Sequence, residues 1–229
     1  MWKEKIPVKS HSSTRINSNH EYLIHEITLQ LSMPSTPPEF HQIIPEKPMR
    51  WVIGYYWLVH QKTPDIDPLV TDWHYHIATT SPACQASPTK PTSIKKTTLL
   101  RSLQEFQTTS FFYKDTSVTH SAALLDPSGN LMANGQDLSV EHALYKSVGH
   151  WLETNAPPVG MMMLSGTISV STVQHAHQLG AYWIISRLAP THAAYTRAKA
   201  LGIGIIGFAR TNRFSVFCLP PIQNAIIIT

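Results

Sequence analysis

The last third of the chain alternates short apolar runs with segments of helical periodicity. The apolar runs are 160–164, 182–186 and 203–208, and the segments between them are 169–179 and 190–201. Each helical segment ends at a glycine, Gly180 or Gly202, and Pro190 stands where the first turn of the second helix tolerates it. Strands that alternate with helices in this way predict parallel strands joined by crossover helices. An alternating strand at 214–218 follows them.

Upstream patterns predict further strands and helices. Residues 46–60 indicate a helix with an aromatic face, because Trp51, Tyr55 and Val59 recur at helical spacing, and Gly54 within it suggests close packing. Residues 72–79 alternate apolar and polar side chains, which is typical of a half-buried strand. The remaining predictions are a strand at 21–31, a short helix at 99–106, a hairpin of 119–125 and 131–133, a helix at 138–152, frayed residues 1–20 and an irregular connection at 32–48.

Composition changes between residues 80 and 98. This stretch is rich in proline, serine, threonine and lysine and has no periodicity, which is typical of a linker or mobile loop. Nine of the ten glycines lie beyond it, and eleven of the seventeen prolines lie within or before it. We therefore predict a smaller α+β N-terminal subdomain over residues 1–98 and an α/β core domain over residues 99–229.

The totals describe a globular chain with a mild positive charge. Of the 229 residues, 42% are apolar and 14% are charged, a balance that argues against disorder. The net charge of +4 is scattered rather than arranged in a basic stripe, so nucleic acid is not an expected partner. No signal-peptide pattern follows Met1, and the nine-residue apolar run at 51–59 is too short to span a membrane. We expect a cytoplasmic protein without a membrane partner.

The loop after the third apolar run carries the clearest binding signal. Its residues are Phe208, Ala209, Arg210, Thr211, Asn212 and Arg213. The two arginines flank a small polar turn at the expected carboxyl end of a strand, where α/β sheets commonly bind phosphate. The loop therefore predicts an anion-binding segment.

Other polar residues have both functional and structural interpretations. Asp137, Glu141 and Lys146 could form a charged site at a helix start, but helix capping by Asp137 and pairing of Glu141 with solvent or lysine is the favoured interpretation. His120 could face a pocket or be a hydrogen-bonded strand residue. His74 and His76 share a strand face without a third ligand, so no metal site is predicted.

The remaining candidates are sulfur-containing residues and two histidines. His175 and His177 are expected on the surface, and the methionines at 161–163 in a buried strand. Two cysteines are too few for a disulfide framework or a zinc knuckle. Cys218 is expected in the core, whereas Cys84, in the stretch rich in proline and serine, is the candidate for a reactive thiol, which would require a lowered pKa.

Three stretches of the last third form a specific pattern: Ser-Gly-Thr-Ile-Ser at 165–169, Ser-Arg-Leu-Ala-Pro-Thr at 186–191, and 202–210 leading to Arg213. Together they resemble the C-terminal half of the FdhD family, the formate dehydrogenase accessory sulfur carriers. Upstream, Thr-His-Ser-Ala-Ala at 119–123, the turn at 126–129, and Gln136 with Asp137 also resemble that family. The similarity is strong from residue 116 to 218 and faint before.

The resemblance implies a cytidine-deaminase-like three-layer α/β core without its zinc. Members of the family take sulfur from a cysteine desulfurase as a cysteine persulfide. They pass it to a molybdenum–bis(molybdopterin guanine dinucleotide) cofactor before that cofactor enters formate dehydrogenase. By resemblance, residues 208–213 bind this cofactor or a GDP-like nucleotide, with Arg210 and Arg213 on the pyrophosphate and Phe208 against a base or pterin face. His120 and Asp137 are further cofactor-binding candidates, and a homodimer is expected.

The chain departs from the family pattern at several charged positions. The family's Cys-x-x-Cys pair is replaced by a single cysteine, Cys84. Its Gly-Arg-His has become Ser139-Val140-Glu141, an aspartate has become Tyr145, and the arginine of Thr-Gly-Arg has become Thr167. Loss of these residues together suggests a changed task.

Two functions remain open, and a third is disfavoured. The first is an FdhD-like accessory protein, a sulfurtransferase by resemblance, that binds the cofactor and transfers sulfur through Cys84 alone. The second is a non-catalytic paralogue that acts as a nucleotide-binding scaffold or chaperone for formate dehydrogenase or another molybdoenzyme. A nucleoside deaminase is suggested only by the fold, and the zinc-ligand motif is missing.

Overall fold

The computed structural model describes residues 3–11, 16–67, 73–83, 86, 90–154, 157–222 and 226–227. The strands are β1 (Lys3–His11), β2 (Ile16–Ile24), β3 (Ile27–Ser32), β4 (Glu39–Ile43), β5 (Lys62–Ile66), β6 (His74–Pro82), β7 (Ile94–Lys95), β8 (His120–Leu125), β9 (Leu131–Asp137), β10 (Met161–Leu164), β11 (Trp183–Ser186), β12 (Gly204–Gly207), β13 (Ser215–Cys218) and β14 (Ile226–Ile227). The helices are α1 (Pro48–Tyr55), the π-helical turn η1 (Tyr56–His60), α2 (Lys96–Thr109), α3 (Phe111–Thr116), α4 (Val140–Glu153), α5 (Val170–Gln178) and α6 (His192–Ala200).

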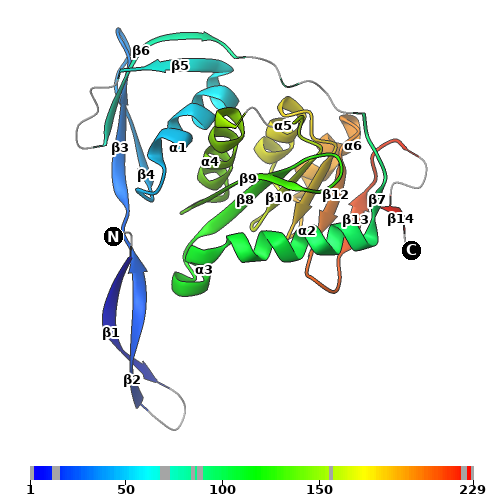
Figure 1. Cartoon of the computed structure of the whole chain (residues 1–229), viewed down its shortest axis with the longest axis horizontal. Helices are drawn as coiled ribbons and strands as arrows, with labels where there is room; N and C mark the ends of the chain where they lie inside the picture. The colour runs from blue at the N-terminus through cyan, green and yellow to red at the C-terminus, as the bar shows by residue number, and fades with distance from the viewer. Residues whose placement is uncertain are drawn as a thin grey trace.

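These elements form a mixed α/β fold (Figure 1). The largest sheet has the strand order β13-β12-β11-β10-β8-β9, and the N-terminal half forms a second sheet ordered β4-β3-β6-β5. Strands β10, β11 and β12 are parallel, and α5 and α6 connect them, as the alternating pattern predicts. The hairpin of β8 and β9 is also confirmed, and it joins the same sheet through β10.

The ends of the crossover helices follow from local chemistry. Ser169 caps α5 by accepting a hydrogen bond from the backbone N–H of Thr172. Gly180 and Gly202 follow the two helices with φ of 74° and 67°, a conformation that favours glycine. The prediction that Pro190 lies in the first helical turn is wrong: it precedes the cap, Thr191, and forms an isolated bridge with Ile168.

Helices cover both faces of the six-stranded sheet (Figure 1). Side chains alternate along β10, so Met161 and Met163 pack in one apolar cluster with α2, whereas Met162 and Leu164 pack in another with α4 and α5. All four are at most 1% exposed, which confirms that the methionine run is a buried strand. Cys218 also lies in the core, with its thiol donating to the carbonyl of Ile203.

The N-terminal region contains more strand than its sequence pattern predicts. Residues 3–11 and 16–20 belong to the hairpin of β1 and β2 and are not frayed, and the strand expected at 21–31 is divided between β2 and β3. Strand β4 lies within the stretch expected to be irregular. Local propensity did not indicate these strands, because they depend on hydrogen bonds to the backbone of neighbouring strands. The hairpin projects from the body of the molecule (Figure 1).

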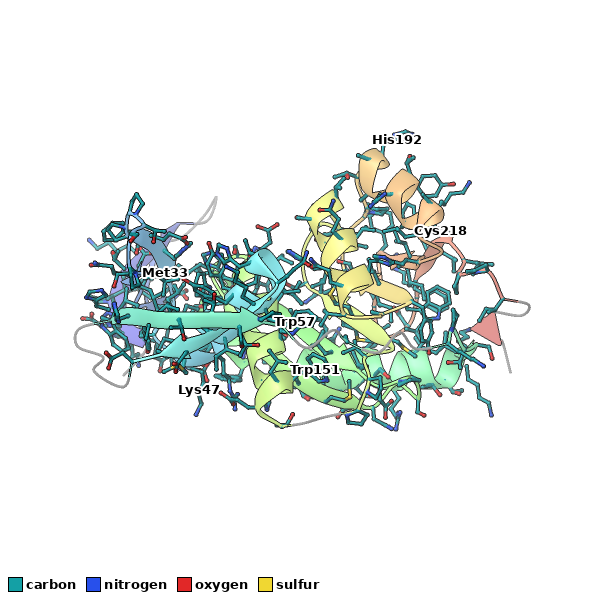
Figure 2. All side chains as sticks on the ribbon, turned by 90° about the horizontal axis from the view of Figure 1, so that it is seen from above. Met33, Lys47, Trp57, Trp151, His192 and Cys218 are labelled. Atoms are coloured by element: carbon teal, nitrogen blue, oxygen red, sulfur yellow. The ribbon has the colours of Figure 1, made fainter. Side chains whose placement is uncertain are left out.

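The aromatic helix packs directly on α4. Gly54 and Gly149 lie at this crossing, where a Cβ atom on Gly54 would stand 1.8 Å from the carbonyl oxygen of Tyr145. The rings of Trp57 and Trp151 meet at the same contact, 5.9 Å apart (Figure 2). One apolar cluster therefore includes residues from both sides of residue 98, and the division into domains at that residue stays a prediction. In the described part of the chain, no helix is both long and apolar enough to span a bilayer.

Candidate functional site

The predicted anion-binding loop leaves the carboxyl end of β12. Phe208 begins it with φ of 50° and a ring that is 49% exposed, whereas Ala209 is buried behind it. The loop is closed by the N–H of Arg210, which donates to the carbonyl oxygen of Arg213 at 2.7 Å. Thr211, Asn212 and Arg213 are exposed to solvent. The sequence therefore identified a tight, accessible turn that presents an aromatic ring and two guanidinium groups.

A cavity of about 310 Å³ lies against this turn, and we call it the loop cavity. It is lined by Phe208, Arg210, Arg213, Phe214 and Ser215. Its walls therefore offer cationic donors, a hydroxyl group and two aromatic rings. Guanidinium groups bind phosphate in a fork geometry and aromatic rings stack on bases, so this lining suits a nucleotide.

A second cavity, of about 270 Å³, also has Arg210 in its lining, and we call it the His120 cavity. Its polar lining includes His120, Ser165, Arg187 and Arg210. The Nδ1 atom of His120 lies 3.2 Å from the hydroxyl oxygen of Ser165, and the backbone N–H of Ser121 donates to that same oxygen at 2.9 Å. Arg210 thus contributes to both cavities and links His120 to the loop.

The two cavities bring together three arginines, Arg187, Arg210 and Arg213. Among the described residues, no ion pair involves Arg187, Arg210 or Arg213. Arg210 instead donates from Nη1 to the carbonyl oxygens of Arg187 and Ala209, at 2.8 and 2.9 Å. Burial, and then the charges of Arg187 and Arg213, lower the pKa of Arg210. Three like charges gathered without a counterion favour the binding of an anion.

Sequence reasoning missed Arg187, Ser165 and Tyr113 in the His120 cavity. A signal for two of them was present, since Ser165 directly follows β10 and Arg187 directly follows β11. The carboxyl ends of parallel strands meet at one edge of a sheet, so these residues had to lie near Arg210. Tyr113 comes from α3, where its ring lies 6.0 Å from the Arg187 guanidinium, a contact that no local pattern indicates.

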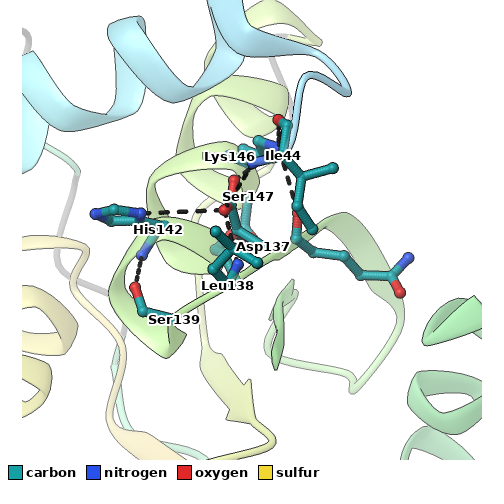
Figure 3. Close-up of polar contacts among 9 residues, drawn as sticks. Ile44, Asp137, Leu138, Ser139, His142, Lys146 and Ser147 are labelled. Atoms are coloured by element: carbon teal, nitrogen blue, oxygen red, sulfur yellow. Dashed lines mark hydrogen bonds and ion pairs between the residues drawn. The ribbon is translucent and has the colours of Figure 1, made fainter. Parts of the chain in front are cut away.

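Asp137 has a different environment from the one its sequence position favoured. The N-cap of α4 is Ser139, whereas Asp137 is fully buried and forms an ion pair with the equally buried Lys146 at 2.7 Å (Figure 3). Its Oδ1 atom also accepts from the backbone N–H groups of Ile44 and Leu138. Glu141 accepts a hydrogen bond from the hydroxyl of Ser171 rather than pairing with a lysine. Asp137 is not among the residues that line either cavity.

The histidines also differ in part from expectation. His175 was expected on the surface, but it is 9% exposed, because α5 packs on the aromatic layer beside Tyr145. His177 is exposed, as expected. The described residues contain no group of three or more side chains able to hold a metal ion, and His74 instead hydrogen-bonds with Ser32. Cys84 lies outside the described residues, so the reactive-thiol hypothesis stays a prediction.

Buried and half-buried histidines make the stability of the protein sensitive to acid. Burial is the largest cause that lowers the pKa of four of them: His120, His142, His150 and His175. Below their unfolded pKa of about 6.5, the unfolded chain binds more protons than the folded chain, so stability decreases as pH falls. We expect the free energy of unfolding to drop by up to about 1.4 kcal/mol per pH unit for each histidine that stays neutral. Urea unfolding at several pH values from about 7 to 5 measures how steeply the free energy of unfolding depends on pH. The His142→Gln variant should show a weaker dependence, and the exposed control His192→Gln should show the same dependence as the wild type.

Comparison with known proteins gives one family. The sequence model of the FdhD/NarQ family matches residues 68–221. The sulfur carrier protein FdhD of Halalkalibacterium halodurans is 31% identical over 138 residues, which cover 58% of this chain and 51% of that protein. The protein of the same name from Staphylococcus haemolyticus is 34% identical over 135 residues, covering 56% and 51%. The chain thus spans about half the length of the curated relatives that it matches.

A solved structure has the same fold. It is the crystal structure of a protein from Desulfotalea psychrophila, provisionally described as a formate dehydrogenase accessory protein. The two structures superpose with a TM-score of 0.80, and the match covers 96% of this chain and 99% of the other. Sequence identity is 15%, so this similarity supports the fold and not the activity.

Proposed function

Because the chain belongs to the FdhD/NarQ family, we propose that it is an accessory protein for the maturation of formate dehydrogenase or another molybdoenzyme. Its task would be to hold the guanine-nucleotide end of a molybdopterin guanine dinucleotide cofactor at residues 208–213. The observation that carries this proposal is a group of three arginines that form no ion pair with any carboxylate in the described part of the chain. The group lies beside an exposed aromatic ring at the end of β12.

The residues of the two cavities fit such a ligand. Arg210 and Arg213 would bind the pyrophosphate, since guanidinium groups donate two parallel hydrogen bonds to phosphate oxygens. Phe208 would stack on the base, for which its half-exposed ring is available. Arg187 and His120 would hold the part of the ligand that extends past Arg210 into the His120 cavity. The cofactor would supply the metal that accepts sulfur, and these residues would bind and orient it.

Calorimetric titration with GDP tests the nucleotide site. We expect the wild-type protein to bind GDP, and the Arg210→Ala/Arg213→Ala variant to bind it about tenfold to several hundredfold more weakly, because two charge-assisted hydrogen-bonding groups are lost. The matched control is Lys95→Ala/Lys96→Ala, which removes the same charge from the exposed start of α2 and should leave the affinity unchanged. Equal affinity in the arginine variant would contradict the phosphate clamp. No binding by the wild type would redirect the search to protein partners.

Sulfur transfer is the part of the proposal that rests on Cys84. The outer sulfur of a donor persulfide would bond to the Cys84 thiolate, and the donor would leave as a thiolate. A cysteine desulfurase is the donor that family membership suggests. The second candidate function, a non-catalytic scaffold or chaperone, is favoured by the absence of a second cysteine near Cys84 and by the changed residues Val140, Tyr145 and Thr167.

The Cys84→Ser variant separates these two functions. We expect it to retain GDP binding and to lose both persulfide loading, seen by mass spectrometry as a gain of one sulfur atom, and formate dehydrogenase activity in a strain without its own family member. Cys218→Ala is the control, because that buried thiol should not accept sulfur. Full activity of Cys84→Ser would favour the scaffold. A cytidine-deaminase-like order of layers, a homodimer and a cytoplasmic location belong to the same proposal.

A further inference from the structure

A third cavity, of about 420 Å³, lies away from the arginine loop, between η1, α5 and α6. The residues that line it come from the last turns of these three helical segments, and we call it the helix-end cavity. Leu58, Val59 and Leu201 supply an apolar wall, and His175, Gln178 and Arg197 are among its polar residues. It shares no residue with the loop cavity or the His120 cavity. One of its walls is a π-helical turn, a feature that often accompanies functional sites.

Two of its polar side chains each have one buried atom without a hydrogen-bond partner among the described residues. The Nδ1 atom of His175 and the Oε1 atom of Gln178 are buried, and neither has a hydrogen-bond partner in the described part of the chain. Such buried groups are costly unless a ligand or water satisfies them. Burial lowers the pKa of His175, so its imidazole is neutral near pH 7 and can accept a hydrogen bond. The amide oxygen of Gln178 is also an acceptor.

The helix ends add to this preference for a hydrogen-bond donor. The carboxyl ends of α5, α6 and η1 all contribute lining residues to the cavity. Each helix end carries a partial negative charge, which favours a cationic group. An ammonium group therefore suits this part of the cavity.

Arg197 makes another part of the cavity suitable for an anionic group. It is exposed, and its guanidinium group makes no ion pair or hydrogen bond with another described residue. A free guanidinium group in a cavity lining is a partner for a carboxylate. The helix-end cavity thus offers a cation at one position, acceptors and helix ends at another, and an apolar wall.

We propose that the helix-end cavity binds a free α-amino acid with an apolar side chain. The carboxylate would pair with Arg197, the ammonium group would donate to Gln178 and His175, and the side chain would pack on Leu58, Val59 and Leu201. The site is independent of the nucleotide site and would make the accessory protein responsive to an amino acid.

Calorimetric titration with L-leucine tests this site, with two analogues that each lack one charged group. L-leucinamide lacks the carboxylate, and 4-methylpentanoate lacks the ammonium group. We expect L-leucine to bind, and each analogue to bind at least about tenfold more weakly than L-leucine. Arg197→Gln should weaken L-leucine binding by a similar factor. Lys199→Gln, which removes a charge from the same helix outside the cavity, should leave the affinity unchanged.

Each outcome of the titration bears on the proposal. No L-leucine binding by the wild type, binding of either analogue as tight as that of L-leucine, or unchanged L-leucine binding by Arg197→Gln would overturn it. The Arg210→Ala/Arg213→Ala variant should bind L-leucine like the wild type while losing GDP. Failure of the nucleotide proposal is thereby separated from failure of the amino-acid site. Gln178→Leu, which replaces the unpartnered amide with an apolar group, should also weaken L-leucine binding without lowering stability.

Discussion

Replacing Lys146 with methionine is expected to lower the free energy of unfolding by about 3–5 kcal/mol. The side chain is 1% exposed, and its Nζ atom donates to the carbonyl oxygen of Ile44 as well as pairing with Asp137 (Figure 3). Methionine fills most of the same volume but leaves a fully buried carboxylate without its cation. Burial lowers the pKa of Lys146 and Asp137 opposes that effect, so the attraction within the pair offsets part of the cost of removing the ammonium group from water.

Urea unfolding followed by tryptophan fluorescence measures this loss. The double variant Asp137→Asn/Lys146→Met should be more stable than Lys146→Met alone, because it removes the unpaired charge. Lys96→Met, on the exposed start of α2, is the surface control and should change the free energy by less than about 0.5 kcal/mol. A loss in Lys146→Met no larger than in this control would show that the pair does not stabilise the fold. Since Lys146 also bonds to Ile44, the same change should loosen the connection between β4 and α1.

The second large effect is expected from Gly54→Ala. On helix propensity alone this substitution should stabilise α1 by about 1 kcal/mol. The added methyl group would lie 1.8 Å from the carbonyl oxygen of Tyr145 and 2.9 Å from the backbone nitrogen of Gly149. Backbone atoms cannot rotate away as a side chain can, so α1 must move off α4. We expect the free energy of unfolding to fall by about 3 kcal/mol or more.

The sign of the change in the free energy of unfolding shows whether helix propensity or the clash between the two backbones is the larger effect. Urea unfolding of Gly54→Ala should show a lower midpoint, and Gly149→Ala should behave similarly, because its Cβ would lie 2.0 Å from the carbonyl oxygen of Arg50. A more stable Gly54→Ala variant would mean that the two helices do not cross this closely. Glu153→Ala and Glu141→Ala on α4 are poor controls, because they remove the ion pair with Arg50 and the hydrogen bond from Ser171. The exposed Gln104→Ala on helix α2 is the better one.

Local signals in the sequence were sufficient for the crossover units and for the loop. Periodicity, a serine cap and glycines that follow the helices specify α5 and α6, because each depends on residues close in the chain. The same holds for the turn at 208–213, where a strand end and two arginines lie within a few residues. Gly54 within an aromatic helix likewise indicated close packing, since only glycine allows backbones to approach this closely, and the structure shows that the partner is α4.

Tertiary structure decided which distant residues share a site. Asp137 pairs with Lys146 and binds Ile44, 93 residues away, so its burial could not be inferred from a position that also suits helix capping. His175 is buried because α5 packs beside α4. The β1–β2 hairpin is held by cross-strand pairing, which its polar sequence does not indicate. The arginine group likewise depends on the parallel sheet, which brings Arg187 and Arg210 to one edge. Local propensity is set by neighbours in sequence, whereas burial and charge pairing are set by neighbours in space.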